Sequence, residues 1–179
     1  MASTQSATRH RIRAAVAFAS YLSVAVACGG GASTVPTPVA PSAAGSPTAA
    51  PASLEAMLTA TLQDEYHAEA TYQRVLAEHG QVWPFVNIVK AEARHAASLA
   101  GLFTARGLSV PSSVWTTANA PGFASVPEAC GAAAQAEIDN VALYDGYLAM
   151  ELPPDVRTVF ENNRAASINN HLPAFTACR

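Results

Sequence analysis

The segment PFVNIVKAEARHAASLAGLFTA, residues 84–105, carries the pattern from which the fold follows. It opens on proline and ends before Gly107, which are usual start and stop signals of a helix. Apolar side chains recur three and four residues apart and predict one core-facing stripe, formed by Phe85, Ile88, Leu99 and Leu102. Glu92 and His95 interrupt this stripe, and residues three apart share a helix face. Because ionised groups are rarely buried alone, the pair needs a partner from another element.

Three further segments show helical spacing, at residues 53–78, about 128–150 and about 155–177. The first places Glu65 on its apolar stripe, and the third places Glu137 there. The last segment aligns four residues on one side, namely Phe160, Ser167, His171 and Phe175. Pro173 is expected to fray or kink its final turn, since proline lacks the backbone N–H. Every predicted helix therefore directs polar groups toward the core.

The connections between these segments predict the topology. Gly80 to Pro84 and Leu152-Pro153-Pro154 are tight breaks, whereas residues 108–127 form a long stretch of poor periodicity. A long connection of this kind is needed where a bundle must cross over from one end to the other. We therefore predict an all-α, ferritin-like four-helix bundle over residues 54–179, with two antiparallel hairpins joined by a long crossover.

Three helices that each direct a glutamate inward indicate a shared cation. Beyond residue 53 the chain has one lysine and six arginines, few of which fall on the stripes. Carboxylate and imidazole ligands suit iron, with manganese or zinc as alternatives. The predicted metal ligands, for a site that can hold two metals, are Glu65, Glu92, His95, Glu137 and His171.

The two hairpins also look like diverged copies of each other. Glu65 precedes Tyr72 by seven residues, and Glu137 precedes Tyr144 by seven. The tyrosine hydroxyls need partners if they are buried, and a metal-bound carboxylate is a candidate. A metal site with pseudo-two-fold symmetry is expected from such a repeat.

These residues resemble the ferritin-like superfamily, and the first hairpin is similar to rubrerythrin-type proteins. Glu65, Ala68 and Tyr72 match its first-helix pattern, and residues 92–96 match its metal motif on the second helix. Residues 54–175 look like the uncharacterised ferritin-like family called DUF2202, including Tyr72 to Gly80 and the late segment Asn-His-Leu-Pro-Ala-Phe at residues 170–175. The resemblance implies a helical bundle with a di-metal carboxylate site. It implies no particular activity, because none is agreed for this family.

The chain departs from the di-iron pattern on its last helix. Glu-x-x-His is expected there, yet Ile168 stands three residues before His171 and Ser167 stands four before it. Glu161 lies ten residues before His171, too far along the axis to be a ligand. The site would then have three glutamates and two histidines, completed by Ser167, Asn163 or water. Such a set suits an asymmetric metal pair or a single metal.

The N-terminal residues 1–27 read as an export signal. Three arginines precede the short uncharged run 14–27, which ends in small residues. In both interpretations the chain is cleaved between Ala27 and Cys28. In the first, Cys28 then carries a lipid, as in a bacterial envelope lipoprotein. In the alternative, cleavage is that of an ordinary signal peptide, Cys28 carries no lipid, and the protein is secreted or periplasmic. Residues 28–53 are of low complexity and are expected to form a flexible tether.

Charge and cysteines narrow the partners. Residues after 53 carry seven basic against thirteen acidic side chains, which argues against a nucleic-acid partner. Cys130 begins the third predicted helix and Cys178 ends the fourth, so antiparallel packing predicts a disulfide between them in an oxidising compartment. The expected partners are metal ions and, through Cys28, a membrane; a homodimer is a possible assembly.

Three functions fit these observations. The first is a di-metal, preferentially di-iron, protein that oxidises iron or handles oxygen or peroxide at the cell envelope. The second is a module that binds metal without catalysis, for storage, sensing or stability. The third is a helical interaction domain with a vestigial site.

Overall fold

The computed structural model describes residues 53–178, and the regular elements of this part of the chain are all helices, with no strand among them. Its elements are α1 (Leu54–His79), α2 (Phe85–Ala105), α3 (Val126–Leu148), α4 (Pro154–Ala166), the π-helical turn η1 (Ser167–His171) and α5 (Leu172–Ala177). The all-α prediction is confirmed for this range. The predicted signal, the predicted lipidation site Cys28 and the tether up to residue 52 lie outside the described residues.

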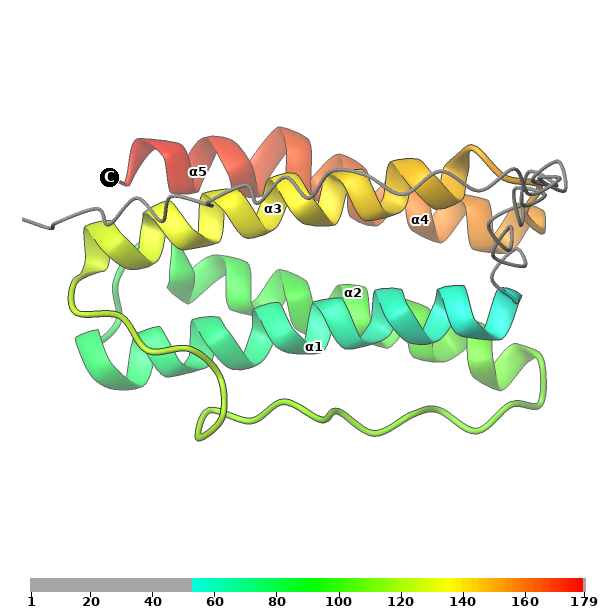
Figure 1. Ribbon diagram of the computed structural model, residues 1–179, viewed down its shortest axis with the longest axis horizontal. Helices are drawn as coiled ribbons and strands as arrows, with labels where there is room; N and C mark the ends of the chain where they lie inside the picture. Colours follow the sequence, from blue (N-terminus) through cyan, green and yellow to red (C-terminus); the bar gives the residue numbers. More distant parts are fainter. Residues whose placement is uncertain (1–52, 179) are drawn as a thin grey trace, which may run out of the picture. The chain divides into compact units, whose positions relative to one another are not determined.

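The helices form two antiparallel hairpins, one of α1 and α2 and the other of α3 with α4, η1 and α5 (Figure 1). The long crossover between α2 and α3 runs along the outside of α1 (Figure 1). Side chains of α1 hold it there. Gln63 donates to the carbonyl of Ser112 at 2.9 Å, and Arg74 donates to the carbonyl of Ala120 at 2.6 Å. The crossover therefore covers one face of the first hairpin.

Local sequence signals explain where the helices begin and end. Ser53 accepts a hydrogen bond from the amide of Ala56 and caps α1. Gly80 ends the helix with a φ of 83°, a conformation that glycine adopts without strain. Ser125 caps α3 in the same way, with Pro127 in its first turn. As a result α3 begins at Val126 and ends at Leu148, two residues earlier at each end than predicted.

The fourth helix differs from the prediction. Pro173 was expected to fray or kink the last turn, but the chain remains helical to Ala177, so that turn does not fray. Instead, the turn before it widens into η1, where the amide of Leu172 donates to the carbonyl of Ser167, five residues back. Ser167 and His171, the first and last residues of this turn, both face the core, where they are 2% and 4% exposed. π-Helical turns inside α-helices are frequent at functional sites.

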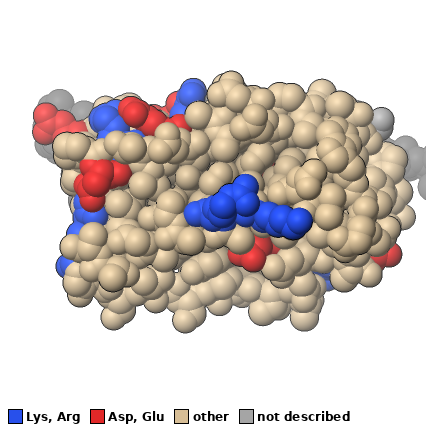
Figure 2. Space-filling view, turned by 180° about the vertical axis from the view of Figure 1, so that it is seen from behind, with Lys and Arg blue, Asp and Glu red and all other residues tan. Residues whose placement is uncertain are grey.

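The core consists of two apolar clusters separated by a polar layer. One cluster contains Leu62, Leu99, Phe103 and Phe160, and the other contains Val75, Phe85, Ile88 and Phe175. Burial of each such side chain stabilises the fold by about 1.5–3 kcal/mol. The buried acids lie between the clusters along the helices. From the side opposite to Figure 1 the surface is mainly uncharged, apart from basic side chains near its centre with an acidic group beside them, and charges of both signs toward the ends (Figure 2).

The disulfide between Cys130 and Cys178 is present, as predicted, and joins the first turns of α3 to the end of α5. The Cα atoms of the two cysteines are 5.9 Å apart. Among residues 53–178, no helix combines the length and the apolar character that crossing a membrane requires.

Candidate metal centre

Four helical elements bring their polar side chains to one point in the middle of the bundle. Glu65 comes from α1, Glu92 from α2 and Glu137 from α3, and the three residues are 1%, 2% and 3% exposed. The predicted inward orientation of the three glutamates is therefore confirmed. Two histidines complete the group, His95 from α2 and His171 from η1. All five residues predicted as ligands thus lie together.

The five residues form two overlapping trios. In the first, Nδ1 of His95 lies 3.2 Å from Oε2 of Glu65 and 3.0 Å from Oε2 of Glu92. In the second, Nδ1 of His171 lies 3.1 Å from Oε1 of Glu92 and 3.4 Å from Oε2 of Glu137. The candidate ligand atoms of each trio all lie within 4.8 Å of one another. Glu92 belongs to both trios, with one carboxylate oxygen directed to each histidine.

The second trio contains two buried atoms that lack a hydrogen bond. Oε1 of Glu92 and Nδ1 of His171 are both fully buried, and neither has a hydrogen-bond partner within the described part of the chain. They face each other at 3.1 Å without the alignment of a hydrogen bond. Buried polar groups are nearly always satisfied, so each exception needs an explanation. A carboxylate oxygen and an imidazole nitrogen that face each other in this way can both bind one cation once the imidazole has lost its proton.

Two tyrosines orient the outer carboxylates in a crosswise pattern. Tyr72 of α1 donates to Oε1 of Glu137 on α3 at 2.9 Å, and Tyr144 of α3 donates to Oε1 of Glu65 on α1 at 2.6 Å. Each hairpin therefore supplies the hydroxyl that holds the glutamate of the other. The sequence repeat of seven residues thus corresponds to a structural pseudo-symmetry. Each tyrosine bond leaves Oε2 of its glutamate for the histidine side.

The glutamates and histidines of the site shift one another's pKa values. Burial raises the pKa of Glu65 to about 7, although the hydrogen bond from His95 opposes this shift. Burial also acts to raise the pKa of Glu92, but His171 and His95 outweigh it, and the pKa falls below its ordinary value. Burial disfavours the charged imidazoles, yet their carboxylate neighbours raise the pKa of His95 to about 9 and that of His171 to about 10. Without a metal, protons on the imidazoles take the place of the cation.

A second polar network adjoins the site, and sequence reasoning missed most of it. Ser167 donates to Oδ1 of Asn140 at 2.9 Å, and the amide nitrogen of Asn140 donates to Asp64 at 2.7 Å. Burial raises the pKa of Asp64 to about 6, while the bond from Asn140 lowers it. Only Ser167 was predicted near the site. The available sequence signal was the doublet Asp64-Glu65 on α1, because Asp64 directly precedes a core-facing glutamate and is half-buried at the edge of the polar layer.

Asn163 was a candidate to complete the ligand set but belongs to neither trio, whereas Glu161 was expected not to be a ligand. Asn163 is 4% exposed and donates to the hydroxyl of Tyr144 at 3.1 Å, so it supports the site through that tyrosine. Glu161 is exposed and belongs to neither trio. No acid of the fourth helical segment joins the two trios, and Ser167 occupies the core-facing position one wide turn before His171.

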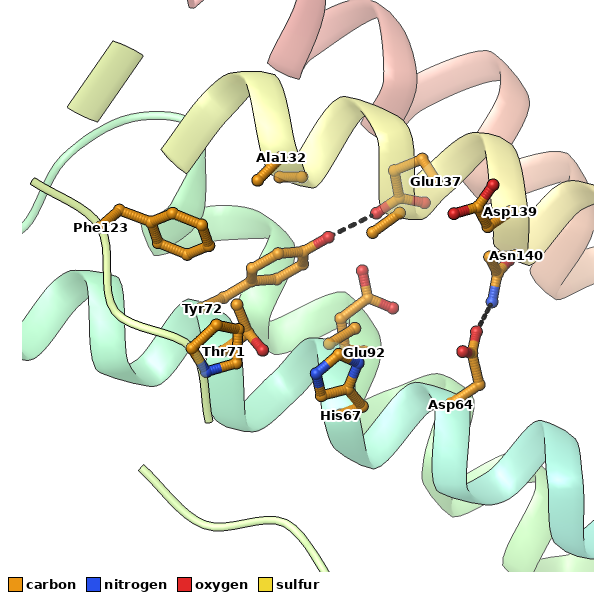
Figure 3. A pocket seen from close by; sticks show the side chains of 14 residues that line it. Asp64, His67, Thr71, Tyr72, Glu92, Phe123, Ala132, Glu137, Asp139 and Asn140 are labelled. Atoms are coloured by element: carbon orange, nitrogen blue, oxygen red, sulfur yellow. Dashed lines mark hydrogen bonds between the residues drawn. The ribbon is translucent and has the colours of Figure 1, made fainter. Parts of the chain in front are cut away.

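An open cavity of about 360 Å³ between α1 and α3 leads to Glu92 and Glu137 (Figure 3). Small alanine side chains of both helices form much of its wall, and Pro121 and Phe123 of the crossover lie at its edge. On one side of the view lie Asp64, Asp139 and Asn140, and on the other lie Thr71, Phe123 and Ala132 (Figure 3). Molecules from solution can therefore reach the acids.

Removing the hydroxyl of Tyr144 is expected to destabilise the protein more than removing that of Tyr72. Tyr144→Phe leaves both Glu65 and Asn163 without their partner, whereas Tyr72→Phe leaves only Glu137. Each buried group left unsatisfied costs about 1–3 kcal/mol. Urea unfolding of the metal-free variants measures the difference, with Tyr147→Phe as a control outside the site. Equal losses for the Tyr72 and Tyr144 variants would contradict the hydrogen-bond assignment.

Comparisons of the chain with protein-family models, with curated proteins and with solved structures found no match.

Proposed function

We propose that this chain is a ferritin-like metal-binding protein of the DUF2202 type, in which each of the two trios of buried residues would hold one divalent ion and Glu92 would contribute to both. The observation that carries the proposal is the pair of unsatisfied atoms, Oε1 of Glu92 and Nδ1 of His171, which face each other inside the core. A cation between them would satisfy both at once. Carboxylate oxygen and imidazole nitrogen are ligands that iron accepts readily, with manganese and zinc as alternatives.

The residues around the trios fit such a pair. Tyr72 and Tyr144 fix the orientation of the outer glutamates, as the hydrogen-bonded neighbours of metal ligands commonly do. The cavity beside Glu92 and Glu137 gives small molecules a route to the site. When bound, a pair of iron ions would supply one-electron chemistry with oxygen or peroxide. The chain itself would provide the ligands, hold their orientation and limit the access of water.

The proposed location is the cell envelope, with Cys28 as the lipid-bearing residue and residues 28–52 as the tether. The signal-like residues 1–27 support export. The disulfide between Cys130 and Cys178 supports it independently, because such bonds persist in oxidising compartments.

A metal-binding role without catalysis is the second candidate, and Ser167 favours it. A serine at this core-facing position replaces the carboxylate that a symmetric pair would receive from the fourth helix. Its hydroxyl is already engaged with Asn140. Neither trio would then receive a further carboxylate from the fourth helix, so the affinity for metal would be lower than in a site that has this carboxylate. Oxygen or peroxide consumption by the iron-loaded protein separates the two candidates.

Elemental analysis of the full chain, purified without an affinity tag, tests the proposal. One to two transition-metal ions per chain are expected, together with unchanged helical content. A chain that folds with the same helical content and takes up neither iron, manganese nor zinc would overturn it. In that case the protonated histidines alone would balance the buried acids.

Metal binding is expected to release protons and to strengthen as the pH rises. The pKa of His95 is raised to about 9 and that of His171 to about 10, so both imidazoles are charged at neutral pH in the metal-free protein. A metal needs them neutral, so about two protons leave and the affinity rises about a hundredfold per pH unit below pH 9. The stability of the metal-free protein is expected to change with pH in the opposite direction. There the raised histidine pKa values stabilise the fold at low pH, and this contribution is lost as the pH rises through 9 to 10.

Calorimetric titration with Zn²⁺ in two buffers of different ionisation enthalpy counts the released protons. Urea unfolding of the metal-free protein between pH 7 and 10 checks the opposite trend. Affinity for Zn²⁺ that does not change between pH 6 and 8 would show that the imidazoles are not ligands.

A further inference from the structure

The cavity between α1 and α3 has a volume of about 360 Å³, which is larger than access for oxygen or a metal ion requires. Cavities that hold small organic molecules in proteins begin at about 300 Å³ and combine apolar walls with a few polar groups. Ala68, Ala132, Ala133 and Ala136 supply most of the apolar wall here. Their small side chains leave space that a larger residue would fill. The cavity thus has the size and lining of a pocket for a small organic molecule.

One wall residue points independently to a ligand. Thr71 lines the cavity and is 8% exposed, and its hydroxyl oxygen has no hydrogen-bond partner within the described part of the chain. A threonine in a helix commonly bonds a carbonyl one turn back, as Thr61 does at 3.0 Å to Met57. Thr71 does not, although it belongs to the same helix. Its hydroxyl is therefore available to a bound molecule.

The charge of the lining selects the kind of molecule. Four carboxylates and one histidine, His67, line the cavity, and no lysine or arginine of residues 53–178 does. The histidines of the trios compensate Glu92 and Glu137, but Asp64 and Asp139 lie beyond them on the far side of the cavity (Figure 3). His67 partly offsets the charge of Asp64, but four carboxylates against this one histidine leave the lining negative, so an anion would be repelled and an ammonium group attracted.

The distance between the polar groups at the two ends of the cavity determines how long the bound molecule should be. Asp64 and Thr71 are seven residues apart on α1, so they lie on one face and about 10 Å apart along the axis. Figure 3 places Asp64 and Thr71 on opposite sides of the cavity, with Glu92 between them. A ring of six carbons between two polar groups suits this separation.

We propose that the cavity binds a small organic ammonium ion with an apolar body, with its ammonium group beside Asp64 and Asp139 and a hydroxyl at its other end hydrogen-bonded to Thr71. Glu92 and Glu137 belong both to the cavity and to the candidate metal centre. That the bound ammonium ion is a substrate of the metal centre therefore rests on the proposed function. Its binding rests only on the cavity.

Three related probes test the proposal by calorimetric titration of the full chain. Tyramine has the ammonium group, the ring and the hydroxyl; phenethylamine lacks the hydroxyl; 4-hydroxyphenylacetate carries a carboxylate in place of the amine. Tyramine is expected to bind about fivefold more tightly than phenethylamine, the difference that one hydrogen bond makes. The anion is expected to bind at least about tenfold more weakly than tyramine.

Two variants locate the binding. Thr71→Val is expected to weaken tyramine to the affinity of phenethylamine and to leave phenethylamine unchanged. Because the hydroxyl has no partner in the protein, the stability of this variant should equal that of the natural chain. Ala136→Leu fills the cavity and is expected to abolish the binding of both amines, whereas Ala142→Leu, exposed on the same helix but outside the lining, should have no effect.

The outcomes separate this inference from the proposed metal centre when the metal content of each sample is measured. A metal-loaded protein that binds no tyramine, or binds it equally well as Thr71→Val, overturns the inference and leaves the metal centre in place. Tight binding of the anion also overturns it. Binding of tyramine with the predicted Thr71 effect to a protein that takes up no metal would support the pocket and remove the metal centre.

Discussion

Replacing Glu92 with glutamine is expected to abolish metal binding altogether, whereas replacing either outer glutamate should cost one metal only. Glu92 directs one carboxylate oxygen into each trio, so an amide at this position removes an anionic ligand from both. Glu65→Gln affects only the trio of His95, and Glu137→Gln affects only that of His171. The metal affinity of each affected trio should fall by more than about a hundredfold. Changing only a hydrogen-bonded neighbour of a ligand already lowers metal affinity by about 10–100-fold, and here a ligand itself is lost.

Elemental analysis after equilibration with iron or zinc gives the stoichiometry of each variant. Glu161→Gln is the matched control, because this glutamate is exposed on α4 and belongs to neither trio. Circular dichroism of the same samples shows whether the bundle remains folded. If Glu92→Gln keeps the metal content of the natural chain, the proposal that Glu92 serves both trios is wrong. If all three core variants lose one metal equally, the two trios do not act as separate halves.

The inward glutamates could be predicted because a helical period leaves little freedom in where a stripe points. Once Phe85, Ile88 and Leu99 face the core, Glu92 must face it as well. The same argument applied to Glu65 and Glu137. Acids that are conspicuous among alanine and leucine are therefore reliable markers of a buried polar layer.

Other features could not be predicted because they depend on how helices pack rather than on one helix. The seven-residue repeat indicated that Tyr72 and Tyr144 are related, but not that each hydroxyl would reach the glutamate of the other hairpin. The bond between Asn140 and Asp64 joins residues 76 positions apart, and no pattern in the sequence pairs the two. The cavity arises from alanines that look like ordinary helix formers.

The π-helical turn shows a different limit. A uniform period of 3.6 residues places Ser167 and His171 near one face but gives no reason for a wider turn. Proline at position 173 removes one amide donor and crowds the carbonyl of Asn169. The sequence therefore indicated a disturbance near the end of the helix, but its form, a turn without a break, depends on packing against α3 and α4. His171 reaches Glu92 and Glu137 from this turn.

Removing the disulfide is expected to lower the free energy of unfolding by about 4 kcal/mol, because the bond closes a loop of 48 residues and restricts the unfolded chain. The variant Cys130→Ala/Cys178→Ala tests this without placing a polar group in the buried position of Cys130. Urea unfolding measures the loss, and reduction of the natural chain by a phosphine should reproduce it. A loss below about 1 kcal/mol would contradict the loop-closure account.

The same variant separates two ways in which the disulfide can support the metal centre. A metal that binds only the folded state adds its own stabilisation, whereas the disulfide acts mainly on the unfolded chain. The two contributions should therefore add, and the loss should be equal with and without bound zinc. His171 lies seven residues before Cys178, with α5 packed on α3 between them. If the variant also lost zinc affinity by more than about tenfold, the disulfide would be holding η1 and His171 in place, and the additivity expected of distant, independent sites would fail.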